Sequence, residues 1–279
     1  MSIAKPRLRF TSVMLVVGLL FLYLPMLVLV VYSFNASKLV TVWSGFSTQW
    51  YGELFRDEQI LSAIWMSLRI AFFSASMAVC LGTIAAFVMT RYGRFRGKTA
   101  LSSMVTAPLV MPEVITGLSL LLLFVQMAQI TGWPADRGMA TIWIAHTTFC
   151  SAYVAVVVAA RLREIDLSIE EAAMDLGSPP MRTFFCVTLP IISPALVAGW
   201  LLAFTLSLDD LVIASFVSGP GANTLPMVVF SSVRMGVSPK INALATLIIL
   251  AVSLATLLAW YLMRRNEAKR QLALKASAH

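Results

Sequence analysis

The chain has 279 residues, of which 59% are apolar and only 12% are charged, and its formal net charge is +8. Soluble domains carry about 25% charged residues, so this composition excludes a soluble globular protein and indicates an integral membrane protein. The positive charge is explained by membrane topology, as the distribution of basic residues shows, and no nucleic-acid partner is expected.

Six apolar segments reach the length of about 20 residues that a helix needs to cross a bilayer. They lie near residues 11–33, 63–90, 100–130, 139–160, 191–217 and 241–263. The sequence therefore predicts an all-α polytopic membrane protein with six transmembrane helices in a single domain, residues 1–279. The first segment is longer than the apolar core of a signal peptide, which has about 7–15 residues, so we expect it to remain as a membrane helix.

Lysine and arginine accumulate on the cytoplasmic side of membrane proteins, and this chain has 21 of them. With a cytoplasmic N-terminus, five fall on the opposite side: Lys38, Arg56, Arg137, Arg234 and Lys240. Arg69 lies inside the second apolar segment, which leaves fifteen on the cytoplasmic side. We therefore expect both termini in the cytoplasm.

The segment "GRFRGKT", residues 93–99, is similar to a phosphate-binding loop but departs from it in spacing. Only three residues separate Gly93 from Gly97, one fewer than that motif requires. The segment also joins two membrane helices and follows no β-strand, so we interpret it as a basic turn. The two histidines and three cysteines of the chain form no recognisable motif. We therefore predict no catalytic residue, no metal site, no disulfide and no cofactor in this chain.

The third apolar segment contains "APLVMPEVITG". Pro108 and Pro112 each remove a backbone hydrogen bond, so we expect a kink there. Glu113 follows directly and lies near the middle of the membrane. Irregular backbone at that depth is tolerated where it borders protein or a water-filled cavity. Glu113 is therefore a candidate for a substrate pathway, with a structural role as the alternative.

The longest cytoplasmic loop, about residues 161–190, reads "RLREIDLSIEEAAMDLGSPPMRTFFCVTLP". Ser168 and Glu171 have the spacing of a capping box, which predicts that a short helix starts there. Gly177 supplies a left-handed residue after this helix, and prolines then stop it. A second short helix is expected over residues 180–190. The first helix is acidic, whereas helices that rest on a membrane are usually basic. We therefore predict that this elbow, residues 161–190, docks a soluble partner.

Two adjacent aspartates, Asp209 and Asp210, interrupt the fifth apolar segment. A charge inside a bilayer costs about 2.5 kcal/mol or more, so the pair needs a physical reason. If Glu113 and both aspartates face one cavity they repel one another, and a cationic ligand relieves that repulsion; a diamine does so at two points. Each aspartate also has a hydroxyl one helical turn earlier, Thr205 for Asp209 and Ser207 for Asp210. We expect that hydroxyl to hold the carboxylate while the site is empty.

Aromatic rings can add cation–π contacts of about 0.5–2 kcal/mol each. Three rings are candidates for the pathway, with packing or anchoring as the alternative for each: Trp143, Tyr153 and Trp200. The aspartates have a structural alternative as well. One of them could pair with Arg69, which lies at a similar depth, or Ser207 or Asp209 could cap a helix that restarts after a break.

The elbow resembles the EAA loop of ABC-importer permeases, and the resemblance extends over all six apolar segments. The residues that carry it, at the spacing of that family, are Glu171-Ala172-Ala173, Gly177 and Leu189-Pro190. More narrowly, "SLDDLVIASFVSGPG" and "LVMPEVITGLSLLLLF" resemble the second permease of bacterial polyamine importers, the putrescine system most of all.

This resemblance implies a type I ABC importer permease fold in the bacterial inner membrane. The residues that would couple the chain to a separate ATPase are Glu171, Ala172, Ala173, Gly177, Leu189 and Pro190. The residues expected along the substrate pathway are Asp209, Asp210, Glu113, Trp143 and Tyr153. The implied partners are a homologous second permease, two copies of the ATPase, which binds ATP and Mg, and a periplasmic substrate-binding protein. The implied substrate is a polyamine, with putrescine preferred.

Other functions stay open at the level of the sequence. Spermidine, a different cation or a neutral solute is an alternative cargo for the same kind of permease. A secondary transporter or channel that needs no ATPase is an alternative of another class, and it would be favoured by inverted repeats, which are not evident. A bare membrane scaffold does not account for carboxylates inside apolar segments.

Overall fold

The computed structural model describes residues 5–39, 42–236 and 238–277. Within these ranges the regular structure is helical, and six helices are long and apolar enough to cross a membrane. The all-α fold with six candidate spans is therefore confirmed. The chain divides into two compact units, one formed by Met1–Glu58 with Ser231–His279 and the other by Gln59–Phe230.

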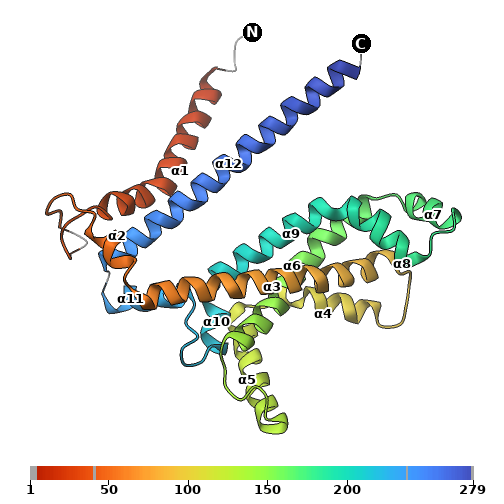
Figure 1. Ribbon diagram of the computed structural model, residues 1–279, viewed down its shortest axis with the longest axis horizontal. Helices are drawn as coiled ribbons and strands as arrows, with labels where there is room; N and C mark the ends of the chain where they lie inside the picture. Colours follow the sequence, from red (N-terminus) through yellow and green to blue (C-terminus); the bar gives the residue numbers. More distant parts are fainter. Residues whose placement is uncertain (1–4, 40–41, 237, 278–279) are drawn as a thin grey trace. The chain divides into compact units, whose positions relative to one another are not determined.

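The first unit contains two candidate spans and a short helix between them. Helix α1 (Lys5–Tyr32) contacts α12 (Pro239–Ser277), and α12 also contacts the short α2 (Gln49–Leu54) (Figure 1). The spans are the apolar parts of the long helices, Phe10–Tyr32 and Pro239–Leu258. The buried Trp50 of α2 donates from Nε1 to the carbonyl of Asn35. Nζ of Lys240 lies 3.8 Å from Oε2 of Glu53 in α2 and 3.3 Å from Oδ2 of Asp57 just after it. These polar contacts hold α2 to the loop after α1 and to the start of α12.

The second unit is built around α6 (Met139–Glu164), the most buried of the candidate spans. It packs against α9 (Leu189–Asp209) and against α4 (Lys98–Val110). Helix α3 (Glu58–Arg91) approaches α6 closely, because a Cβ added at Gly82 would lie only 2.8 Å from the Cβ of Val154. Small residues at such positions let membrane helices approach and gain van der Waals contact. Helix α11 (Leu225–Met235) starts with its Leu225 N–H donating to Oγ of Ser67 in α3.

Two of the predicted spans are broken helices. The segment predicted over residues 100–130 forms α4 and α5 (Glu113–Thr131), separated at Met111 and Pro112, so the expected kink is a full break. The segment predicted over residues 191–217 forms α9 and α10 (Val212–Val217), and Asp210 between them has extended backbone. Helix α10 packs against both α5 and α6. Both breaks therefore lie in the same region of the second unit (Figure 1).

The elbow lies at the other end of α6 and α9 (Figure 1) and contains two short helices, α7 (Leu167–Asp175) and α8 (Pro180–Thr183). A π-helical turn, η1 (Phe184–Thr188), then leads into α9. The predicted capping box of Ser168 and Glu171 is wrong: the cap is Asp166, whose carboxylate accepts the Ser168 N–H at 3.0 Å. An aspartate two residues before Ser168 offers a stronger, charged acceptor for the same exposed N–H groups. This hydrogen bond lowers the pKa of Asp166, so the cap is charged at neutral pH.

The end of α7 is formed as the sequence predicts. Gly177 has φ +88°, its N–H donates to the carbonyl of Met174, and the N–H of Ser178 donates to that of Ala173. This pair of bonds is a Schellman motif, which satisfies carbonyls that the helix end would leave free. The positive φ is a conformation that residues with a side chain resist. Gly177 thereby sets the angle between α7 and α8.

Candidate functional site

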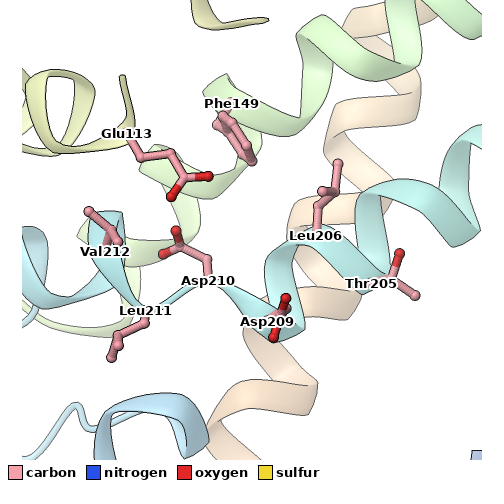
Figure 2. Close-up of a pocket in the computed structure, with 8 residues that line it drawn as sticks. All are labelled: Glu113, Phe149, Thr205, Leu206, Asp209, Asp210, Leu211 and Val212. Atoms are coloured by element: carbon pink, nitrogen blue, oxygen red, sulfur yellow. The ribbon is translucent and has the colours of Figure 1, made fainter. Parts of the chain in front are cut away.

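A cavity of about 490 Å³ lies at the two helix breaks of the second unit. Its lining residues come from α5, α6, α9 and the start of α10: Glu113, Phe149, Thr205, Leu206, Asp209, Asp210, Leu211 and Val212 (Figure 2). The three carboxylates that the sequence singled out are therefore brought to one cavity. They come from chain segments almost one hundred residues apart, and the broken helices are what allow their backbones to reach it.

Each carboxylate stands at a helix end. Glu113 is the first residue of α5, where the helix dipole favours a negative charge. Asp209 is the last residue of α9, where free carbonyl groups add their partial negative charge to its own. That end of a helix favours a cation, and broken membrane helices of transporters bind cations in this way. The cavity therefore has the electrostatic character of a cation site.

Asp210 is the buried member of the group, with 9% of its surface exposed. Its two carboxylate oxygens accept the N–H groups of Ile213 and Ala214, at 3.3 and 2.8 Å, so it caps α10. Nε2 of His146 lies 3.0 Å from Oδ2 of Asp210, in a close approach that is not aligned as a hydrogen bond. Nδ1 of the same histidine lies 2.7 Å from Oγ of Ser207. Asp210 thus contacts α10 and His146 of α6, and His146 in turn contacts Ser207 of α9.

The surroundings of Glu113 and Asp209 differ from those of Asp210. Both side chains are exposed, and among the residues that the structure describes neither makes a hydrogen bond or an ion pair. In Figure 2 the Glu113 carboxylate points toward that of Asp210, and Asp209 lies on the other side of Asp210. Two carboxylates at the cavity are therefore available to a ligand, and the third is occupied by the protein.

Two predicted contacts of the aspartates are wrong: the ion pair with Arg69 and the hydrogen bonds from nearby hydroxyl groups. Over the described ranges Arg69 forms no ion pair with either aspartate, and its guanidinium lies 4.7 Å from the ring centroid of Trp65. The hydroxyl groups do not hold the carboxylates either: Thr205 donates to carbonyl groups of its own helix, and Ser207 contacts His146. Capping after a helix break does occur, but the cap is Asp210. The extended backbone there turns its carboxylate toward α10 and away from its own helix.

The aromatic ring at the cavity is Phe149, and neither Trp143 nor Tyr153 is part of the lining. Tyr153 packs edge-on against Phe149, with 5.1 Å between ring centroids, one helical turn beyond the cavity. Trp143 lies on the side of α6 toward α3, where its carbonyl accepts the hydroxyl of Ser74. Trp200 donates from Nε1 to Ser76 and lines a different groove. The helix breaks lie against the part of α6 that carries Phe149, so Phe149 lines the cavity and Trp143 and Tyr153 do not.

His146 is a site residue that sequence reasoning missed. It is almost fully buried in α6, and its contacts, Ser207 and Asp210, lie more than sixty residues further along the chain. In the sequence, the residue type of His146 was the one indication of its role. A histidine inside an apolar membrane segment has to find polar partners within the protein.

The elbow forms a second site, at the other end of the unit. Glu171 and Ala172 of α7 are exposed and Ala173 is half-buried, so this face of the helix is open. Leu189 is half-buried and Pro190 exposed at the start of α9. Large apolar side chains are exposed beside them, Leu176 at 90% and Met181 at 70%. Leu176 lies outside the candidate membrane spans, and an apolar side chain exposed there is typical of a surface that binds another protein.

Glu170 anchors the elbow to the membrane helices. Its Oε1 lies 3.0 Å from Nη2 of Arg91, the last residue of α3, and accepts the hydroxyl of Thr188 at 3.1 Å. The Glu170 and Arg91 side chains are only 11% and 8% exposed. This buried pair was not predicted from the sequence, because Arg91 lies far from Glu170 along the chain.

Comparison with known proteins places the chain among transport proteins. The family described as "Binding-protein-dependent transport system inner membrane component" matches residues 78–271. The putrescine transport system permease protein PotI of Escherichia coli K12 is 68% identical over 258 residues, 92% of each chain. The spermidine/putrescine transport system permease protein PotC of the same strain is 40% identical over 249 residues, 89% of this chain and 91% of that one.

Solved structures agree on the fold. A chain of a bacterial ABC transporter involved in the import of the acidic polysaccharide alginate superposes with a TM-score of 0.73 and 16% identity, over 94% of this chain and 98% of that one. A chain of an amino acid ABC transporter gives a TM-score of 0.53 and 20% identity, over 76% and 96%. At these identities the likeness concerns the fold alone.

Proposed function

The chain belongs to the family of binding-protein-dependent transport system inner membrane components, and we propose that it imports putrescine across the bacterial inner membrane as one permease subunit of an ATP-driven complex. Members of this family are transport subunits and not enzymes. On this proposal residues 1–279 act as one permease domain, with both termini in the cytoplasm. The chain itself needs no cofactor, because ATP and Mg are bound by the ATPase.

The observation that carries the choice of substrate is the cavity at the helix breaks. Glu113 and Asp209 line it without a partner in the described chain, and the C-terminal end of α9 adds negative potential beside Asp209. A diamine has two positively charged ammonium groups, one for each of these two negatively charged carboxylates. The ring of Phe149 offers a face for a cation or for the methylene chain between the ammonium groups. The 68% identity to a putrescine permease supports the same substrate.

The complex that we propose contains a homologous second permease, two ATPase copies and a periplasmic substrate-binding protein. The exposed face of α7 with Glu171, Ala172 and Ala173 docks on the ATPase. Closure of the ATPase pair moves the elbow, and Glu170 passes that movement to α3 through Arg91 and to the start of α9 through Thr188. Helix α9 ends at Asp209, so the moving helix carries a cavity carboxylate at its far end.

Reconstitution of the assembled complex into liposomes tests this function. Labelled putrescine is offered with the binding protein on one side and ATP on the ATPase side, with unlabelled putrescine, unlabelled spermidine and a neutral sugar as competitors. We expect uptake that requires ATP, is competed by polyamines and is insensitive to the sugar. Uptake without ATP would contradict the importer, and preferred uptake of a neutral solute would contradict the cation site. Stronger competition by spermidine than by putrescine would indicate that spermidine is the preferred substrate.

A further inference from the structure

A groove on the second unit contains an arginine among aromatic side chains. It has a volume of about 530 Å³ and lies between α3 and α9, and it shares no lining residue with the carboxylate cavity. Its lining residues are Trp65, Leu68, Arg69, Phe72, Phe73, Trp200 and Phe204, of which only Arg69 is charged. Trp65, Phe72 and Phe73 are at least half exposed, so the groove opens outward. Transport by the carboxylate cavity does not account for this feature.

The position of Arg69 along α3 places it at the edge of the membrane. Arg91 ends α3 beside the elbow, which marks one surface of the bilayer. The 22 residues from Arg69 to Arg91 span about 33 Å at a rise of about 1.5 Å per residue. The hydrocarbon core is about 30 Å thick. Arg69 therefore lies at the level of the lipid headgroups on the side opposite the elbow, and not within the hydrocarbon as its place in the second apolar segment indicated.

The aromatic residues of the groove continue from that level into the membrane. Phe72 and Phe73 follow Arg69 by one turn of α3, toward the centre of the bilayer. Trp200 stacks on Phe204 and lies edge-on to Phe72. It is about 17 Å along α9 from the elbow end, near the middle of the hydrocarbon. The groove thus has a cationic end at the headgroups and an apolar floor that runs inward.

The guanidinium of Arg69 has room for an anion. Over the described residues it makes no hydrogen bond and no ion pair, and it lies over the ring of Trp65 at 4.7 Å. A guanidinium binds phosphate through two parallel hydrogen bonds, which are strong because both partners are charged. Tryptophan is enriched at the headgroup level of membrane proteins. An arginine with a tryptophan at this depth, above an apolar groove, matches a phospholipid in charge and in shape.

We propose that this groove binds one phospholipid of the membrane leaflet opposite the elbow. Its phosphate lies on Arg69 beside Trp65, and one acyl chain runs along Phe72 and Phe73 to Trp200. A lipid held there packs against α3 and α9, the two helices that the elbow moves. This binding site is separate from the substrate cavity and independent of which polyamine the complex imports.

Photocrosslinking in the assembled complex tests the occupant. Phe73→p-benzoylphenylalanine is introduced into the otherwise unchanged chain, the complex is irradiated in bacterial membranes, and adducts are identified by mass spectrometry. We expect an adduct with the mass of a phospholipid. Crosslinking to a protein segment, either of this chain or of the second permease, would overturn the proposal, and so would the absence of any lipid adduct.

Charge variants test the role of Arg69. Arg69→Gln should lower the yield of the lipid adduct by about tenfold, whereas Arg69→Lys, which keeps the charge, should retain a larger part of it. Arg94→Gln removes one charge from the exposed loop at the other end of α3 and should leave the yield unchanged. If the adduct forms equally in Arg69→Gln complexes, the phosphate assignment is wrong. Complex assembly is measured in each variant, so a folding defect is recognised separately.

Discussion

Asp209 and Asp210 are neighbours in the sequence with opposite surroundings. Asp210 is buried, caps α10 through two backbone N–H groups and lies against His146. Asp209 is exposed at the cavity and ends α9. The backbone changes from helical to extended between them, which turns one carboxylate into the protein and leaves the other at the cavity. We therefore assign structure to Asp210 and cation contact to Asp209.

Removal of the Asp210 carboxylate should destabilise the complex. Asp210→Ala leaves two buried N–H groups without an acceptor and removes the carboxylate beside His146, a loss of about 1–3 kcal/mol, so the Tm of the purified complex should fall by several degrees. Asp209→Ala is the matched control, because Asp209 has no partner to lose in the described chain, and its Tm should stay close to that of the unchanged complex. Equal losses of Tm in the two variants would show that Asp210 is not a cap.

The two broken spans show what a sequence can and cannot reveal about such elements. The break before Glu113 was partly predictable, because Pro112 cannot donate a backbone hydrogen bond and the preceding residue avoids helical backbone. The break at Asp210 contains no proline or glycine, and the run looked continuous. It is stabilised by contacts with His146, which no local pattern reveals. The three carboxylates of the cavity were predictable from their cost in the membrane, whereas their partners required the fold.

Gly177 is the element-scale test of the elbow. A valine at φ +88° is strained by about 1–3 kcal/mol, so Gly177→Val should change the angle between α7 and α8. We expect normal membrane insertion and a several-fold lower ratio of putrescine taken up to ATP hydrolysed. Gly93→Val is the control, because Gly93 is an exposed loop residue without a positive φ and an added Cβ there meets nothing within 4 Å. Normal coupling in Gly177→Val would refute a role for the elbow angle.

Substitutions at the two adjacent glutamates of α7 should have different effects. Glu170→Gln removes the negative charge that pairs with the buried Arg91. The elbow should therefore detach from α3, and the ratio of putrescine taken up to ATP hydrolysed should fall. Glu171 is exposed, so Glu171→Lys should leave the isolated permease stable and weaken its association with the ATPase. Copurification measures association, and uptake per ATP measures coupling. A Glu171→Lys complex that keeps its ATPase at normal affinity would show that the docking face lies elsewhere.

At the scale of the whole molecule, the two sites lie at opposite ends of the second unit. The elbow with Glu170 lies at one end of α6 and α9, and the breaks with their carboxylates lie at the other. The excess of lysine and arginine predicts which end faces the cytoplasm. Composition alone was enough for the class of protein and the number of spans, since both depend on apolar length and not on contacts.

Cysteine labelling in intact cells tests that orientation. Cys186 lies exposed in η1 at the elbow end, and Asn223 lies exposed in the loop before α11. An impermeant thiol reagent added from outside should label Asn223→Cys and should not label Cys186 until the membrane is opened. The reverse pattern would contradict both the cytoplasmic termini and the docking of a cytoplasmic ATPase on the elbow.

The most direct test of the account is putrescine uptake by a complex that lacks the two available carboxylates. Glu113→Gln with Asp209→Asn keeps the shape of the cavity and removes both charges, so uptake should fall by about tenfold or more, equivalent to about 1.4 kcal/mol of lost attraction. Assembly and basal ATP hydrolysis should stay normal. The control, Glu58→Gln with Asp136→Asn, removes two exposed charges outside the cavity and should transport normally. Normal putrescine uptake by the Glu113 and Asp209 variant would contradict the assignment of this cavity to the cation.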